Sequence, residues 1–522
     1  MKAFDYSLVK DPQYFCDNRM EAHSDHVYYR DGNEMQAAVQ DGTETSFRYS
    51  LNGLWKFHYA RNYKSTVQGF EKEDYCCYDW DDIHVPAHIQ MEGYDAPQYA
   101  NVQYPWEGHE EIYPGQIPER FNPVASYVKY FTVPEHMKGK RLFISFQGAE
   151  SGLALWLNGA FVGYSEDSFT PSEFELTDYL KDGQNKLAAQ VFKWTSSSWC
   201  EDQDFFRFSG IYRDVYLYTI PEVHVRDMRV RTLLDETFTK ADLELVLKGV
   251  GNGNVKICLS KDGEVIANVK GALGSESRFV ILVEQPKLWS AEAPELYDLL
   301  IQVFDENQKL MEVIPYRVGF RRFEMKGNIM TLNGKRIVFK GVNRHEFSSV
   351  TGRHVSREEL IKDLVTMKQN NINAIRTCHY PDGSDIYELC DEYGIYIGMS
   401  HHEPCMRSGA EYSKVRGPKS PYGDAWSYVT NKEGILRFWE DGVKRSIGHN
   451  VFPTVGMRGE NDSKMLGEDS LISDNVRLLK EIITKQREMI HEHLETDGKK
   501  VPQLFAVYKE VEDYYFGGGS EE

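Results

Sequence analysis

The stretch NAIRTCHYP, residues Asn373–Pro381, decides how the C-terminal part of this chain is organised. It closes on His379-Tyr380-Pro381 directly after a strand-like run. In a barrel of alternating strands and helices, the groups that contact substrate lie just past the strand ends. The stretch therefore predicts a barrel strand that carries a site residue, His379, at its end.

The segments around this stretch alternate between strand and helix patterns. A capping box at Ser356–Glu359 opens a helix that runs through Gln369. Such alternation indicates parallel strands joined by crossover helices. The other patterns are strands at 336–345, 395–404, 451–462 and 502–510, and helices at 384–394, 432–447 and 473–494.

Five strands are too few to close a barrel of eight. We therefore expect residues 323–517 to form an incomplete (β/α) TIM-type barrel, followed by a short tail at 518–522. We expect its exposed core to make the chain poorly soluble or to drive it into a homo-oligomer.

The part of the chain before this region is rich in short strands and turns. The hairpin signal Asn158-Gly159 lies between two apolar runs, and residues 1–220 have the pattern of a jelly-roll β-sandwich with an N-terminal arm. Residues 221–322 continue with about a hundred residues of strands, which suits an immunoglobulin-like β-sandwich. The predicted fold class is thus multidomain β plus α/β.

Charge and composition limit the partners. The net charge of -20 argues against nucleic acid and anionic membranes. The first residues lack the apolar core of a signal peptide, and no apolar run reaches membrane-spanning length. The eight cysteines contain no C-x-x-C pair, which favours reduced thiols in a cytoplasmic protein.

Polar residues gather just past each predicted barrel strand, where a site is expected. Two carboxyl groups at such a site could act together as a general acid and as a base or nucleophile; where they hydrolyse a glycoside, they lie about 5–5.5 Å apart when configuration is retained and about 6.5–9.5 Å apart when it is inverted. Candidates for this pair are Glu403, Glu460, Asp462 and Glu510, and the spacing does not choose among them. His401-His402-Glu403 also reads as a metal-ligand set, although adjacent residues rarely bind one ion together. The strand-end residues are His345, Glu346, His379, His401, His402, Glu403, Arg458, Glu460, Asp462, Lys509 and Glu510.

Long motifs in the first 397 residues resemble family 2 glycoside hydrolases, the β-galactosidases in particular. They include VPAHIQMEGYDAPQYANVQYPWEG (85–108), SSWCEDQDFFRFSGIYRDVYLY (197–218) and GVNRHE (341–346). The resemblance implies a galactose-binding-like jelly roll, an immunoglobulin-like domain and then the barrel. It also implies hydrolysis of terminal non-reducing β-D-galactose residues in β-galactosides.

The same resemblance assigns roles to individual positions. Asn101 resembles a loop residue that reaches the galactose site, and Asp204 one that contacts the sugar and a Na⁺. His345 and His379 resemble the histidines that bind galactose hydroxyls. The family's Mg²⁺ ligands and acid/base glutamate are replaced here by GMSHHEP (398–404) and VGMRGEND (455–462), so that Mg²⁺ site is expected to be lost.

Residues 398–517 instead resemble part of the barrel of family 115 glycoside hydrolases, the xylan α-glucuronidases. In that family Arg458 would resemble a carboxylate-binding arginine, Asp462 and Glu510 the acidic pair, and His401 and His402 sugar contacts. The chain thus resembles a chimera, with 323–397 like family 2 and 398–517 like family 115.

Three functions follow from these observations. The first is a β-galactosidase, and the second is a xylan α-glucuronidase that uses Asp462 and Glu510. The third is a non-catalytic galactoside-binding protein, because sugar contacts without the two catalytic carboxylates bind and do not cleave. Each implies a β-galactoside or another oligosaccharide as partner, and no organic cofactor.

Overall fold

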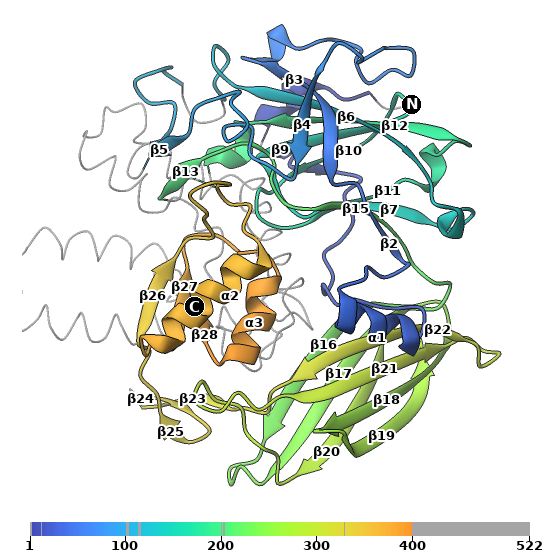
Figure 1. The fold of residues 1–522 in the computed structure, drawn as a ribbon, viewed down its shortest axis with the longest axis vertical. Helices are drawn as coiled ribbons and strands as arrows, with labels where there is room; N and C mark the ends of the chain where they lie inside the picture. Colours follow the sequence, from blue (N-terminus) through green and yellow to red (C-terminus); the bar gives the residue numbers. More distant parts are fainter. Residues whose placement is uncertain are drawn as a thin grey trace, which may run out of the picture. The chain divides into compact units, whose positions relative to one another are not determined.

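Two β-sheets face each other in the N-terminal part of the chain (Figure 1). Seven strands pair in the order β1-β10-β9-β12-β6-β3-β4 and four in the order β11-β7-β15-β2. Apolar side chains from both sheets fill the space between them, among them Trp55, Leu155 and Leu217. The strands are β1 (Cys16–Asp17), β2 (Arg48–Ser50), β3 (Gly53–Ala60), β4 (Asp81–Val85), β6 (Val124–Thr132), β7 (Leu142–Phe146), β9 (Gly152–Leu157), β10 (Ala160–Glu166), β11 (Ser172–Glu175), β12 (Gln184–Phe192) and β15 (Val215–Thr219).

The predicted hairpin at Asn158-Gly159 is confirmed between β9 and β10. Leu157 pairs with Ala160, and the two turn residues have φ of 52° and 80°. Only residues that tolerate positive φ fit such a two-residue turn. Two further strand pairs extend from the sandwich, and short helices connect its strands. They are β5 (Gln98–Ala100) with β13 (Phe205–Arg207), β8 (Ala149–Glu150) with β14 (Gly210–Ile211), and the 3₁₀ helices η1 (Tyr6–Lys10), η2 (Tyr63–Ser65), η3 (Glu135–Met137), η4 (Thr177–Tyr179) and η5 (Ser196–Trp199).

A second sandwich follows. Its three-stranded sheet has the order β16-β17-β20 and its four-stranded sheet the order β19-β18-β21-β22. Strand β20 alternates between buried and exposed residues, as expected for a sheet with one solvated face. The strands are β16 (His224–Leu234), β17 (Lys240–Val250), β18 (Gly253–Lys261), β19 (Glu264–Leu273), β20 (Ser277–Glu284), β21 (Tyr297–Phe304) and β22 (Leu310–Val318).

One helix in the N-terminal arm, α1 (Gly32–Asp41), is not among the sequence predictions. Asp31 caps its first turn and Gly42 ends it at a φ of 67°. Both signals are visible in the sequence. None of its residues is fully buried, and its apolar residues are mostly small, so its sequence gives a weak helical signal.

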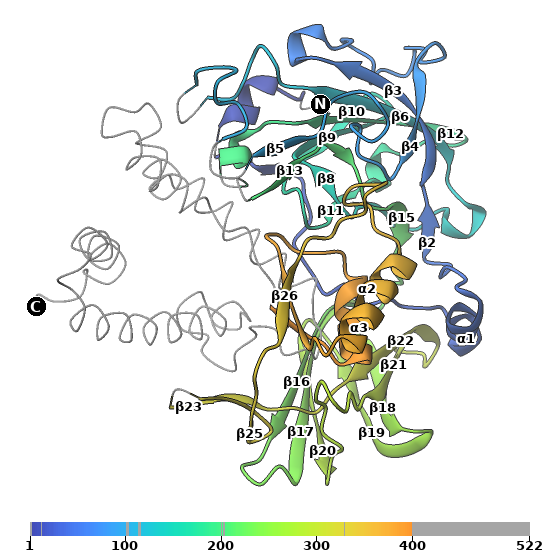
Figure 2. The ribbon, with the colours of Figure 1, turned by 60° about the vertical axis from the view of Figure 1, so that its left-hand side comes forward.

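The C-terminal part of the described chain is the start of a parallel α/β unit. Strands β26 (Gly341–Arg344), β27 (Ala374–Thr377) and β28 (Tyr396–Gly398) pair in parallel. Helices α2 (Arg357–Gln369) and α3 (Asp385–Tyr393) lie together on one face of this sheet (Figures 1 and 2). The predicted capping box between Ser356 and Glu359 is present. The alternation predicted for 336–398 is therefore confirmed, and the connecting strands before it are β23 (Phe323–Lys326), β24 (Ile329–Leu332) and β25 (Lys335–Arg336).

The computed structural model describes residues 3–11, 13–100, 104–112, 116–199, 201, 204–327 and 329–398. The strands and helices predicted after residue 398, the number of barrel strands and the tail lie outside these residues. The six cysteines within them form no disulfide with one another. None of their helices has the length and apolarity needed to span a bilayer.

Candidate active site

Two histidines meet at the carboxyl edge of the parallel sheet. His345 directly follows β26, and His379 lies two residues after β27. Because parallel strands end at the same edge, residues that follow them become neighbours. The two imidazole rings lie edge to face with centroids 5.7 Å apart.

The surroundings keep His345 neutral. Its side chain is exposed on one side, yet partial burial lowers its pKa, and the positive charge of His379 and Arg353 lowers it further. A neutral imidazole offers one hydrogen-bond donor and one acceptor. That combination suits sugar hydroxyl groups, which also donate and accept.

Asp204 reaches the same place from the jelly roll. It directly precedes β13, and its Oδ1 accepts a hydrogen bond from the hydroxyl group of Tyr99 on β5. This hydrogen bond raises the pKa of Tyr99. The carboxylate is near enough to His345 to oppose the lowering of that histidine's pKa. The structure therefore places His345 and His379 together, with Asp204 close enough to act electrostatically on His345; all three were selected from the sequence.

A buried arginine holds the jelly roll against the strand ends. Arg353 is 1% exposed, forms an ion pair with Glu150 and donates from Nη1 to the carbonyl of Phe206 at 2.8 Å. Its guanidinium lies 5.3 Å from the ring centre of Tyr380, which stacks on Phe169 at 4.6 Å. Sequence reasoning missed Arg353, because its ion-pair partner Glu150 lies 203 residues away in the sequence and no local pattern indicates such a pair.

Glu346 serves a different purpose from the one its position after β26 predicts. Its Oε2 accepts a hydrogen bond from Arg213 at 2.6 Å, and its Oε1 accepts one from the amide of Gly383 at 2.9 Å. Nearby, Asp382 accepts a hydrogen bond from Arg344 at 2.8 Å. Burial and the charge of Glu346 raise the pKa of Asp382 to about 8. Both carboxyl groups are buried and engaged, so neither is placed to flank a glycosidic bond.

A cavity of about 370 Å³ lies beside this ion-pair network. The N-terminal arm, the jelly roll and the loop after β26 line it, with Arg48, Glu173, Glu346 and Arg353 among the charged groups. His345, His379 and Asp204 do not line it. The cavity is thus separate from the histidine pair.

The other residues selected from the sequence lie outside the described residues. They are the carboxylates Glu403, Glu460, Asp462 and Glu510, the strand-end residue Lys509 and the sugar contacts Asn101, His401, His402 and Arg458.

Family models match this chain in three places. The model for glycosyl hydrolases family 2, sugar binding domain, matches residues 48–221, and that for glycosyl hydrolases family 2 matches 223–321. The model for glycosyl hydrolase family 115 matches 332–521. The prediction that two hydrolase families share this chain is confirmed, although the family 115 match begins earlier than residue 398.

Solved structures share the fold. A β-glucuronidase from Bacteroides uniformis aligns with a TM-score of 0.62 at 21% identity, over 78% of this chain and 46% of its own. A Bifidobacterium dentium β-glucuronidase complexed with coumarin-3-O-glucuronide aligns with a TM-score of 0.63 at 20% identity, over 84% of this chain and 73% of its own.

Sequence relatives are more similar. A β-galactosidase from Halalkalibacterium halodurans is 52% identical over 397 residues, which are 75% of this chain and 39% of the relative. The chain thus spans about two fifths of that relative's length. The β-galactosidase large subunit of Leuconostoc lactis is 38% identical over 488 residues, which are 88% of this chain and 77% of the subunit. The chain belongs to glycosyl hydrolase family 2.

Proposed function

We propose that this chain is a β-galactosidase-type glycoside hydrolase that recognises terminal non-reducing β-D-galactose residues in β-galactosides. The observation that carries the proposal is the meeting of His345 and His379 at adjacent strand ends, with Asp204 contributed by the jelly roll. Imidazoles and a carboxylate are suitable partners for the hydroxyl groups of a sugar. The β-galactosidase relatives support the choice of galactose.

The proposed cleavage step follows a retaining route with two carboxyl groups. One protonates the leaving oxygen, and the other attacks the anomeric carbon before water releases the sugar. Glu403, Glu460, Asp462 and Glu510 are the proposed sources of this pair. Glu346 and Asp382 are excluded as the catalytic pair, because each accepts a hydrogen bond from a buried arginine.

A second candidate is hydrolysis of xylan side chains by an α-glucuronidase mechanism. The match of family 115 to residues 332–521 favours it. Asp462 and Glu510 would act as the acidic pair, and Arg458 would bind the substrate carboxylate. The third candidate, galactoside binding without cleavage, requires only the residues near the histidine pair.

The Mg²⁺ implied by the family resemblance fits the chain poorly. Among the described residues Asp204 is the carboxylate proposed for Na⁺, and one of its oxygens already accepts from Tyr99. Mg²⁺ requires several oxygen ligands in octahedral geometry. The segment expected to carry those ligands reads GMSHHEP instead. We therefore route no chemical step through either ion.

Calorimetric titration of the full chain with isopropyl β-D-thiogalactoside tests the binding site. We expect His345→Ala and His379→Ala each to weaken binding about tenfold, because each removes a hydrogen bond to the sugar. His354→Ala is the matched control. That histidine lines the separate cavity, so binding should change less than about twofold. Equal binding by all three variants would refute the proposed site.

Two hydrolysis assays separate the candidates. The proposal expects release of nitrophenol from a nitrophenyl β-D-galactoside and no release of glucuronic acid from glucuronoxylan. The opposite pattern would support the α-glucuronidase. Activity on neither, with intact thiogalactoside binding, would support the non-catalytic protein. Galactoside hydrolysis that survives Glu403→Gln, Glu460→Gln, Asp462→Asn and Glu510→Gln would refute our choice of carboxylates.

A further inference from the structure

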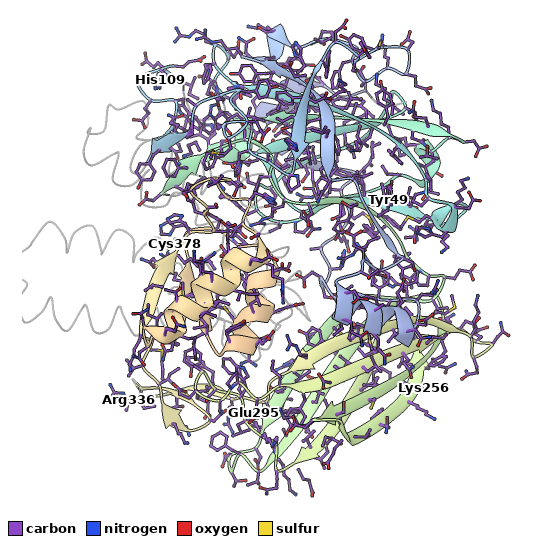
Figure 3. The ribbon with its side chains drawn as sticks, viewed as in Figure 1. Tyr49, His109, Lys256, Glu295, Arg336 and Cys378 are labelled. Carbon is purple, nitrogen blue, oxygen red and sulfur yellow. The ribbon has the colours of Figure 1, made fainter. Side chains whose placement is uncertain are left out.

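Three metal-ligating side chains gather at the ends of β26 and β27. They are His345, Cys378 and His379, whose ligand atoms all lie within 4.8 Å of one another. Cys378, labelled in Figure 3, directly follows β27. Cys378 has no part in the sugar site proposed above.

The register of the parallel strands creates this cluster. Arg344 is the β-ladder partner of Thr377, so the next residues along the two strands, His345 and Cys378, are also neighbours. The amide of Cys378 donates to the carbonyl of Arg344 at 2.8 Å, which fixes the backbone on both sides. His379 follows Cys378 directly and turns its ring toward His345. The three ligands therefore sit on a constrained backbone.

The chemistry of the set points to a soft metal ion. Imidazole and thiolate groups select ions such as Zn²⁺, whereas Mg²⁺ and Na⁺ prefer oxygen ligands. Bonds of about 2.0–2.3 Å in tetrahedral geometry place ligand atoms roughly 3.3–3.8 Å apart. The observed cluster reaches that spacing by closing about 1 Å, which side-chain rotations can supply.

We propose that His345, Cys378 and His379 bind one thiophilic divalent ion such as Zn²⁺, with a water molecule as its fourth ligand. Three protein ligands and one water are the arrangement of catalytic zinc sites, whereas structural zinc sites have four protein ligands. The guanidinium of Arg376 lies 3.9 Å from the sulfur of Cys378 and repels a cation. We therefore expect weaker binding than at a structural zinc site.

The ion and a galactoside would compete, because both need the imidazoles of His345 and His379. This consequence rests on the proposed function, whereas metal binding itself does not. A soft metal ion would act as an inhibitor of the sugar site. Removing the thiol should abolish that inhibition and leave the two histidines in place.

Titration of the chelator-treated full chain with Co²⁺ alone tests the site. A bound thiolate produces a thiolate-to-Co²⁺ charge-transfer absorption in the near ultraviolet. We expect one equivalent of this absorption in the parent chain, its loss in Cys378→Ser, and at least tenfold weaker binding in His345→Asn. Cys258→Ser, on strand β18 of the second sandwich, is the matched control and should keep the signal.

His345→Asn also guards against misfolding, because this side chain is exposed and its loss should leave the fold intact. An absorption that Cys378→Ser and His345→Asn leave unchanged would overturn the site. Loss of the absorption in the control Cys258→Ser, to the same extent as in Cys378→Ser, would also overturn the site.

A competition arm separates this inference from the proposed function. Displacement of Co²⁺ by isopropyl β-D-thiogalactoside would support both. Co²⁺ binding that the thiogalactoside does not reverse would support the metal site and overturn its overlap with the sugar. Thiogalactoside binding without a charge-transfer absorption would overturn the metal site and leave the proposed function standing.

Discussion

The ion pair between Arg213 and Glu346 joins the jelly roll to the parallel α/β unit. The two side chains are 11% and 5% exposed, and the nitrogen and oxygen are 2.6 Å apart. Arg213 also donates to the carbonyls of Phe169 at 2.7 Å and Pro381 at 3.0 Å. We predict that Glu346→Gln strongly destabilises this junction, because it keeps the shape of the side chain and leaves a buried guanidinium without its counter-charge.

The expected cost is about 3 kcal/mol. Removing one partner of a buried pair typically costs about 3–5 kcal/mol. The lower end applies here because Asp382 can compensate in part. The charge of Glu346 helps to raise the pKa of Asp382, so without that charge Asp382 ionises more readily and faces Arg213 as a carboxylate.

Hydrogen exchange of the amides of β26 and β27, followed by mass spectrometry, measures this cost. The method reports local opening and does not require that several domains unfold in one step. A loss of about 3 kcal/mol corresponds to exchange that is roughly 150-fold faster. The control is Glu175→Gln, which breaks a doubly bonded pair with Arg141 that is 53% and 38% exposed. Exposed pairs contribute about 0–1 kcal/mol, so exchange near Glu175 should rise less than about fivefold. A rise of less than fivefold at β26 and β27 in Glu346→Gln would refute the reasoning.

Three further predictions concern stability. Burial raises the pKa of Glu166 to about 7. Between about pH 4.5 and 7 the carboxyl group of Glu166 is therefore protonated in the folded state and ionised in the unfolded state. The free energy of unfolding should fall by up to about 3 kcal/mol as pH rises through this range. Glu166→Gln should remove that slope in denaturant melts, and an unchanged slope would contradict this assignment. Ser356→Ala removes the cap of α2 and should cost about 1 kcal/mol, measured as faster amide exchange in the first turn, whereas Ser356→Asp should restore it. Leu364→Ala leaves a cavity at a fully buried position on the inner face of α2 and should lower the free energy of unfolding by about 2–5 kcal/mol, measured by the same amide exchange. A loss below about 1 kcal/mol would contradict this prediction, because it would mean that neighbouring side chains fill the cavity.

Local patterns predicted the elements that local forces create. The hairpin at Asn158-Gly159 forms because its turn needs two residues at positive φ, and α2 begins where Ser356 and Glu359 can cap each other. The alternation of strand and helix after residue 336 predicted parallel pairing, since such strands need a crossover. Helix α1 was not predicted because, although it has caps, none of its residues is fully buried and its apolar residues are mostly small.

The sequence by itself determined the order of the elements, the family and the positions of His345 and His379 at strand ends. Only the tertiary structure decided what surrounds them. Asp204, next to a strand of the jelly roll, acts electrostatically on His345. Arg213 donates a hydrogen bond to Glu346, which lies 133 residues further along the sequence. The thiol of Cys378 joins the two imidazoles only because β26 and β27 pair in one register. Such contacts depend on how distant segments pack, and that packing leaves no signal in the spacing of neighbouring residues.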